Sequence, residues 1–327
     1  MSCVGGAQMK TQTSHREWVV AGVCLGLLLG AGGCVGDAMD DSPPLERGWI
    51  AQETLATNGL STNGLSTNGL STNGLSTNGL STNGLSTNGL SAVSFVDWFN
   101  GNESVAYSDR VMKYVVACAL PSGQTRTWTN PVTGASHSWA GQLGLATAWA
   151  NGSPATVAEQ QRLSACLAAH VNKFGVSVPI SVRGRDSAGA ALTVTSSEAA
   201  TYSEPEACFF GNLFTGEGVF AGSDRVLKKQ ESTARACGLS SKAKGENTEC
   251  PPIVHMGPCA SVCTRDATNA FWKSCVVNGV SYLPITTYLR PQDIYTCGDG
   301  TCQFTESCGA GKTYDSCSLD CLACGTP

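Results

Sequence analysis

The sequence predicts an α+β protein with a disulfide-rich globular body. One observation is a helix pattern over residues 155–173, which Ser153 and Pro154 introduce. A second is a set of short strand patterns, among them residues 176–183 and 191–195. The third is the cysteine usage, because 14 of the 17 cysteines follow residue 100. An even number of cysteines behind an export signal is typical of disulfides formed in an oxidising compartment.

The first 33 residues have the features of a secretory signal peptide. Lys10 and Arg16 precede an apolar run over residues 19–29, and small residues follow up to Gly33. The apolar run is much shorter than the roughly 20 residues that a membrane-spanning helix needs. We therefore expect a signal peptide over residues 1–33 and no stable membrane span.

Small residues, from Gly30 to Gly33, stand directly before Cys34. This arrangement resembles the lipobox of bacterial lipoproteins, and the resemblance implies that Cys34 is lipidated and anchors the chain in a lipid membrane. Ala31 stands where that family usually has leucine, which leaves ordinary secretion as the alternative. Val35 stands where the inner-membrane retention signal often has aspartate, so the resemblance favours the outer membrane or the cell surface.

A polar linker over residues 34–56 leads into seven consecutive copies of Thr-Asn-Gly-Leu-Ser at residues 57–91. A period of five residues matches neither the 3.6-residue period of a helix nor the two-residue period of a strand. Asn-Gly favours turns, and no charged residue lies between Glu53 and Asp97. We predict a neutral, turn-rich, low-complexity tether.

The alternative for this array is a pentapeptide-repeat β-helix, because the leucines recur every five residues from Leu60 to Leu90. That family places a small residue two positions before its buried Leu or Phe and Asp or Asn one position before it. Asn and Gly occupy those positions here. Seven copies would also complete fewer than two coils, and stacked repeats need several neighbours to bury a core.

The body is expected over residues 92–296. Residues 94–100 form a short amphipathic stretch, and Ser108 with Asp109 resembles an N-cap before a buried helix over residues 110–118. Residues 125–128 and 136–139 predict a β-hairpin.

Residues 108–113 and residues 223–228 have nearly the same sequence, Ser-Asp-Arg-Val-Met-Lys and Ser-Asp-Arg-Val-Leu-Lys, and each copy is expected to begin a helix. Either a duplicated half-domain or two independently capped helices would explain it. Between the copies, the glycine- and aromatic-rich residues 208–222 are predicted to form a structural loop that Cys208 holds in place. Their spacing is wrong for a dinucleotide-binding fingerprint.

Charge and cysteine spacing limit the partners. The net charge of −5 and the 14% of charged residues leave no basic patch for nucleic acid. A zinc centre is the weaker reading of the cysteines, since only Cys321 and Cys324 form a C-x-x-C. The predicted disulfide cysteines are Cys118, Cys166, Cys208, Cys237, Cys250, Cys259, Cys263, Cys275, Cys297, Cys302, Cys308, Cys317, Cys321 and Cys324.

No motif fixes a reaction, and no catalytic residue is assigned. The histidines at 137, 170 and 255 lack a recognisable nucleophile motif such as G-x-S-x-G. The acidic pairs at residues 204 and 206 and at residues 217 and 224 would suit a glycosidase but are more often solvated. The tryptophans at 128, 139 and 149 could line a sugar platform, although buried hairpin tryptophans are more common.

Residues 297–327 form a distinct cysteine-rich module that begins Cys-Gly-Asp-Gly-Thr-Cys. It resembles C-G-D-G-x-C modules at the ends of secreted bacterial proteins and, more loosely, calcium-binding Notch-type modules. Six cysteines could hold so short a segment without a core. Alternatively, Asp299, Glu306 and Asp320 could bind calcium, which takes oxygen ligands; no other cofactor is expected.

The combination of signal, Asn-Gly-Leu repeats, cysteine-rich body and C-G-D-G-x-C tail resembles uncharacterised myxobacterial lipoproteins. The resemblance implies location and class but no activity. We expect a tethered, non-enzymatic lipoprotein with a structural, adhesive or ligand-binding role, whose ligand at the cell surface is a glycan or a protein. The alternative is a secreted hydrolase acting on glycan or peptide.

Overall fold

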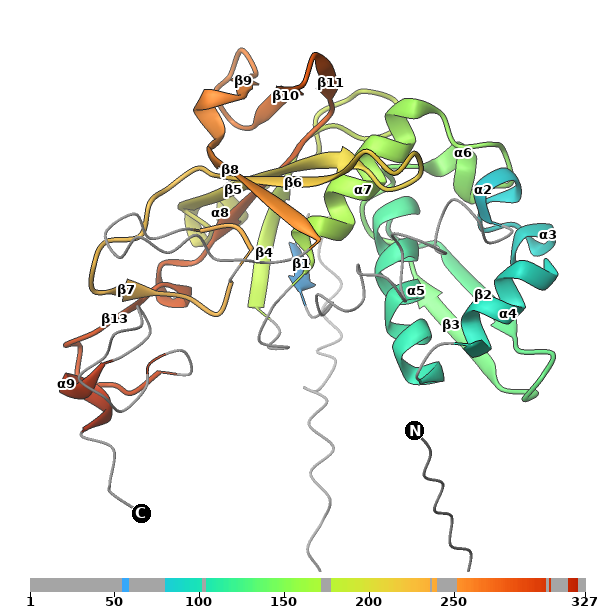
Figure 1. Ribbon diagram of the computed structural model, residues 1–327, viewed down its shortest axis with the longest axis horizontal. Helices are drawn as coiled ribbons and strands as arrows, with labels where there is room; N and C mark the ends of the chain where they lie inside the picture. Colours follow the sequence, from blue (N-terminus) through green and yellow to red (C-terminus); the bar gives the residue numbers. More distant parts are fainter. Residues whose placement is uncertain are drawn as a thin grey trace, which may run out of the picture. The chain divides into compact units, whose positions relative to one another are not determined.

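The computed structural model describes residues 55–58, 80–101, 104–171, 178–235, 237–239, 252–303, 306 and 317–322 (Figure 1). The described residues all belong to one compact unit. The predicted signal peptide, Cys34 and almost all of the linker lie outside the described residues. Within the described ranges, no helix combines the length and apolar character that crossing a membrane requires.

A six-stranded sheet organises the body. Its strands lie in the order β1, β4, β12, β5, β6, β8, and all neighbours are antiparallel except the parallel pair β6 and β8. The strands are β1 (Leu55–Asn58), β4 (Val178–Arg183), β12 (Ile285–Leu289), β5 (Glu204–Asn212), β6 (Gly218–Ser223) and β8 (Ile253–Pro258).

Both faces of β5 are buried, which places a core on each side of the sheet. Ala207 and Phe209 belong to the larger core, to which α7 (Val157–Ala169) contributes six residues. Cys208 and Phe210 alternate with them and belong to a smaller core beneath a second sheet. That three-stranded sheet consists of β9 (Cys263–Arg265), β10 (Trp272–Val277) and β11 (Val280–Tyr282).

Helix α7 confirms the helix predicted over residues 155–173, with narrower bounds. Thr156 is the N-cap, and its hydroxyl and the carboxylate of Glu159 form a capping box. Glu159 also accepts hydrogen bonds from the backbone N–H groups of Ala148 and Trp149, at 3.1 and 3.2 Å. This one carboxylate therefore starts α7 and fixes it to α6 (Thr147–Ala150).

The last copies of the repeat belong to the globular body. They form two short helices, α2 (Leu80–Asn83) and α3 (Thr87–Leu90), and Leu80, Leu85 and Leu90 are 1%, 0% and 3% exposed. The backbone of Leu80 accepts a hydrogen bond from the indole of Trp149 at 2.7 Å. The predicted tether over residues 57–91 thus differs from the structure at its C-terminal end, because the body offers these leucines an apolar surface. Thr57 and Asn58, from the first copy, are part of β1.

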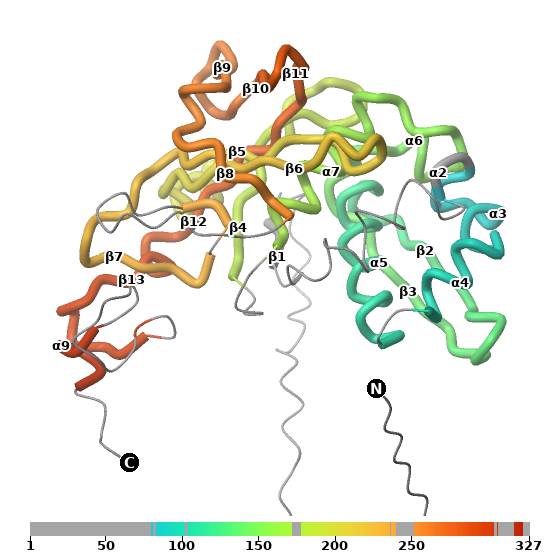
Figure 2. The backbone as a smooth tube through the Cα atoms, viewed as in Figure 1, coloured from blue at the N-terminus to red at the C-terminus, as the bar shows by residue number. Residues whose placement is uncertain are grey.

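Helices α2 and α3 lie in a helical region that also contains the hairpin (Figure 2), and the buried leucines belong to its core. It is built from α4 (Val93–Gly101), α5 (Val105–Ala119), β2 (Thr125–Thr129) and β3 (Ser136–Ala140). The amphipathic stretch and the hairpin are confirmed. Helix α5 begins earlier than predicted, after Ser104, and Ser108 lies buried inside it rather than capping it.

Three local predictions are wrong. Ala191 makes only an isolated bridge with Arg185, and residues up to Thr195 form no strand. Residues 208–222 form the hairpin of β5 and β6 instead of a loop. Ser223 ends β6 and begins no helix, so the sequence similarity between residues 223–228 and 108–113 does not mark a duplicated half-domain.

A buried ion pair lies at the margin of the larger core. Arg235 and Glu206 have side chains 1% and 0% exposed, and two guanidinium nitrogens donate to the two carboxylate oxygens at 2.7 and 3.1 Å. The remaining short elements are α8 (Ser196–Thr201), β7 (Glu231–Ser232), η2 (Cys259–Ser261), η3 (Pro291–Asp293), β13 (Tyr295–Thr296) and α9 (Ser318–Cys321).

Candidate functional site

In the described part of the C-terminal module, the potential metal-ligand atoms that lie within 4.8 Å of one another belong to Cys297, Cys317 and Asp320. Of the three predicted calcium ligands, Asp299 and Glu306 thus do not share a cluster of that size with Asp320. The carboxylate of Asp320 accepts hydrogen bonds from the backbone N–H groups of Gly298, Asp299 and Gly300, at 2.6, 3.2 and 2.9 Å. Disulfides Cys297–Cys317 and Cys302–Cys321 hold this loop against α9. Asp320 therefore organises the loop through backbone amides.

Glu306 leaves an unused oxygen inside the module. Its Oε2 accepts the backbone N–H of Gln303 at 3.1 Å. Its Oε1 and the Oε1 of Gln303 are buried and meet no hydrogen-bond donor from any described residue. Burial raises the pKa of Glu306; the hydrogen bond from Gln303 opposes this, and the charges of Asp320 and Asp299 add to it.

Asp299 completes the group. Its Oδ1 accepts the N–H of Thr301 at 2.9 Å, and its Oδ2 accepts the side-chain amide of Gln303 at 2.7 Å. The group offers only oxygen atoms to a cation, which suits Ca²⁺. Gln303 was not among the predicted ligands, because an uncharged side chain gives no signal of its own in the sequence.

Every cysteine among the described residues is disulfide-bonded, which confirms the predicted disulfides for this part of the chain. Cys34, Cys250, Cys308 and Cys324 lie outside the described residues. The sequence left the pairing open, and Cys237 is bonded as well. The described bonds are Cys118–Cys166, Cys208–Cys259, Cys263–Cys275, Cys297–Cys317 and Cys302–Cys321.

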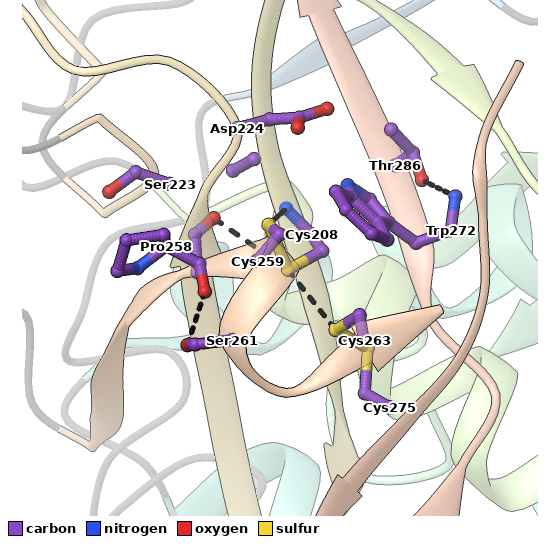
Figure 3. Close-up of a disulfide and its surroundings, with 12 residues drawn as sticks. Cys208, Ser223, Asp224, Pro258, Cys259, Ser261, Cys263, Trp272, Cys275 and Thr286 are labelled. Atoms are coloured by element: carbon purple, nitrogen blue, oxygen red, sulfur yellow. Dashed lines mark hydrogen bonds between the residues drawn. A yellow bond between two sulfur atoms is a disulfide. The ribbon is translucent and has the colours of Figure 1, made fainter. Parts of the chain in front are cut away.

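Two of these disulfides touch in the smaller core (Figure 3). The Sγ atoms of Cys208 and Cys263 lie 3.6 Å apart, although the two cysteines belong to different bonds. The backbone N–H of Cys208 points at Cys259 Sγ, 3.0 Å away. Trp272 packs in the same cluster, and its backbone N–H donates to the hydroxyl of Thr286 at 2.8 Å.

His137 is held in an aromatic cluster. Its Nδ1 lies 2.6 Å from Asp109 Oδ1, which also accepts the indole N–H of Trp139 at 2.9 Å. The ring centroids of Phe99 and His137 are 4.9 Å apart. The Nε2 of His137 is buried and finds no hydrogen-bond partner among the described residues.

The other two histidines have structural partners. Burial lowers the pKa of His170 to about 4, and its Nδ1 lies 2.7 Å from the carbonyl oxygen of Cys166. The Nδ1 of His255 accepts the N–H of Gly257 at 3.2 Å, and its Nε2 lies 3.1 Å from Ser223 Oγ. Burial lowers the pKa of His255, and a backbone hydrogen bond with Gly238 opposes this shift.

In each acidic pair considered for a glycosidase, the two carboxylates contact different partners. Glu204 lies 3.4 Å from Arg225, while its neighbour Glu206 pairs with Arg235. Asp224 pairs with Arg265. The carboxylate of Glu217 instead faces Tyr282. Burial of Tyr282 and its hydrogen bond with Glu217 raise the pKa of Tyr282 to about 12.

The three tryptophans considered as a sugar platform are buried. Trp128, Trp139 and Trp149 are 9%, 3% and 0% exposed. The ring of Trp128 packs edge-on against Phe95 and Phe99, with centroids 5.1 and 4.7 Å apart. They contribute apolar area to the core, the more common role for hairpin tryptophans.

A cavity of about 580 Å³ lies between the last repeat copies and strand β2. We call it the repeat groove; its walls include Leu85, Ser86, Leu90, Thr127, Trp128 and Thr129. Arg126 also lines the groove, and it donates from Nε to the carbonyl of Leu85 at 3.1 Å and from Nη2 to Asn151 Oδ1 at 2.6 Å. The groove exists only because the repeat docks on the body, so the sequence pattern gave no sign of it.

A family model for the GLTT repeat (6 copies) matches residues 55–81, 64–91 and 74–96. The match covers the pentapeptide array and the first residues of α4, which confirms a repeat-containing protein. Neither the curated proteins nor the solved structures contain a match to this chain.

Proposed function

We propose that the protein is an exported lipoprotein, anchored through Cys34 at the outer membrane or cell surface, with a structural, adhesive or ligand-binding role. The observation that carries the proposal is the complete disulfide bonding of the described cysteines, since such bonds persist in oxidising compartments. The apolar run and small residues before Cys34 support the anchor. The likeness of the repeat and the C-G-D-G-x-C tail to uncharacterised myxobacterial lipoproteins agrees with this assignment.

Replacing Cys34 tests the anchor. The variant Cys34→Ser should lose its acyl chains and move from the membrane fraction to the soluble fraction, as measured by mass spectrometry and fractionation. Cys24→Ser is the matched control, because it changes a cysteine of the same apolar region ahead of the cleavage zone. Membrane-bound Cys34→Ser protein would contradict the lipid anchor.

The repeat groove is the proposed ligand site, and an envelope polysaccharide is the proposed ligand. Serine and threonine side chains line it, and their hydroxyls can exchange hydrogen bonds with the hydroxyls of a sugar chain. A protein ligand lying along β2 is the other outcome of the test.

Filling the groove tests this ligand site. Thr127→Arg should abolish binding of the purified protein to isolated envelope polysaccharide, measured by sedimentation. Thr133→Arg, on the exposed hairpin turn, should bind like the original protein. Equal binding by both variants would exclude the groove.

The alternative function is a secreted hydrolase, and His137 is the observation that favours it. Asp109 orients this imidazole, and Nε2 has no partner among the described residues, as in a general base before substrate binds. That nitrogen is buried beside Phe99 and Trp139, so a substrate would have to displace aromatic rings. Hydrolysis of glycan or peptide that His137→Gln abolishes would establish the alternative.

We also propose that the C-terminal module binds calcium. The support is a pair of buried oxygens that meet no donor among the described residues, Glu306 Oε1 and Gln303 Oε1; the amide of this Gln303 also donates to Asp299. Calorimetry on the full mature chain should give a Kd of roughly 10⁻⁴ to 10⁻³ M. Glu306→Gln should lose binding, whereas Asp97→Asn, an exposed acid in α4, should keep it; no heat in the original protein would exclude the site.

A further inference from the structure

The two disulfides of the smaller core lie within reach of one another. Cys263 Sγ is 3.6 Å from Cys208 Sγ, close to van der Waals contact. The Sγ atoms of Cys208, Cys263 and Cys275 all lie within 4.8 Å of one another. A thiolate formed at Cys263 would therefore face the sulfur of the neighbouring disulfide without any movement of the backbone (Figure 3).

Among the four cysteines of these two disulfides, Cys263 is the one that a soluble thiol can reach. Cys208, Cys259 and Cys275 are each 0% exposed, whereas Cys263 is partly exposed at the start of β9. Thiol–disulfide exchange needs access to the attacked sulfur. Of these two bonds, a soluble thiol will therefore meet Cys263–Cys275 first, because the Cys208–Cys259 bond is shielded inside the core.

We infer that this pair of disulfides is a thiol-exchange centre that a small dithiol opens at Cys263. One thiolate of the dithiol attacks Cys263 Sγ, which forms a mixed disulfide and releases Cys275 as a thiolate that takes up a proton. The second thiol of the reagent then attacks its own sulfur in the mixed disulfide and releases Cys263. The dithiol leaves as a cyclic disulfide, so two electrons have passed to Cys263 and Cys275.

The second stage is internal and involves no net reduction. The Cys263 thiol loses a proton, and its thiolate attacks Cys208 Sγ. The Cys208–Cys259 bond breaks, the Cys208–Cys263 bond forms, and Cys259 leaves as a thiolate that takes up a proton. The products are one disulfide, Cys208–Cys263, and two thiols, Cys259 and Cys275.

The exchange preserves a covalent link between two parts of the fold. Before it, Cys208 in β5 is joined to η2, and the second bond ties β9 to the directly opposite residue of β10. After it, Cys208 is joined to β9 itself. The six-stranded sheet thus stays bonded to the segment that carries the three-stranded sheet, although one disulfide has been lost.

Limiting reduction of the full mature chain tests the inference. One equivalent of dithiothreitol, followed by rapid alkylation and peptide mass mapping, should give a Cys208–Cys263 peptide with alkylated Cys259 and Cys275. Alkylation of Cys263 and Cys275 with Cys208–Cys259 intact would overturn it. Reduction confined to other disulfides of the chain would also overturn it.

A variant isolates the internal stage. Cys275→Ser leaves Cys263 without its partner, so after incubation at about pH 8 the free thiol should be shared between Cys263 and Cys259 in mass mapping. Cys166→Ser, which frees Cys118 near no described second disulfide, is the matched control and should keep its thiol at one position. A thiol that stays on Cys263 alone would refute the exchange, and the reduction experiment decides the matter if the variant does not fold.

Discussion

Replacing Leu85 by alanine tests whether the last repeat copies are part of the core. Leu85 is 0% exposed, and its carbonyl accepts the Nε–H of Arg126. The substitution removes three carbon atoms, worth about 2.4 kcal/mol at roughly 0.8 kcal/mol per buried methylene. The cavity left behind raises the expected loss of unfolding free energy to about 3–4 kcal/mol.

An exposed side chain directly after the array supplies the control. Val93 is 75% exposed, so Val93→Ala should alter the unfolding free energy by less than about 0.5 kcal/mol. Urea denaturation followed by tryptophan fluorescence measures both, because Trp149 donates to the backbone of Leu80 in the docked segment. Equal losses in the two variants, or no loss in Leu85→Ala, would refute the assignment of these copies to the core.

Three further changes probe the interior. Arg235→Met leaves Glu206 buried without its partner and should cost about 3–5 kcal/mol in urea denaturation, most of which Glu206→Leu in the same chain should restore. The unfolded chain protonates His170 below about pH 6.5, whereas the folded chain does so only near pH 4. The free energy of unfolding should therefore fall by about 3 kcal/mol as the pH is lowered across that window. His170→Gln should show a shallower pH dependence, and an unchanged dependence would contradict the prediction. Replacing both Cys118 and Cys166 by alanine opens a loop with a sequence separation of 48 and should cost about 4 kcal/mol, measured by calorimetry.

Local signals in the sequence determined several elements. The capping box of Thr156 and Glu159 begins a helix through contacts within one turn, so the pattern over residues 155–173 was sufficient to predict α7. The hairpin of β2 and β3 was predicted for the same reason, since a turn joins its two short strands. The cysteine count and the signal-like start determined that disulfides should form, because pairing requires only an oxidising compartment.

Tertiary contacts determined the features that local sequence patterns do not encode, namely the burial of β5 and the pairing of the cysteines. Strand β5 is buried on both faces, which removes the alternation that marks a strand, and its hairpin with β6 was therefore mistaken for a loop. Which cysteines pair, and that two disulfides touch, depends on how distant strands meet.

The repeat shows the difference most directly. Thr57 and Asn58 of the first copy lie in a strand, whereas Thr87 and Asn88 of the last copy begin a helix, so the sequence of a copy does not by itself determine its structure. Leu80, Leu85 and Leu90 are buried because α4, α5 and the hairpin present an apolar surface next to them. Burial is a property of a residue together with its surroundings, and for these leucines only the folded chain supplies the surroundings.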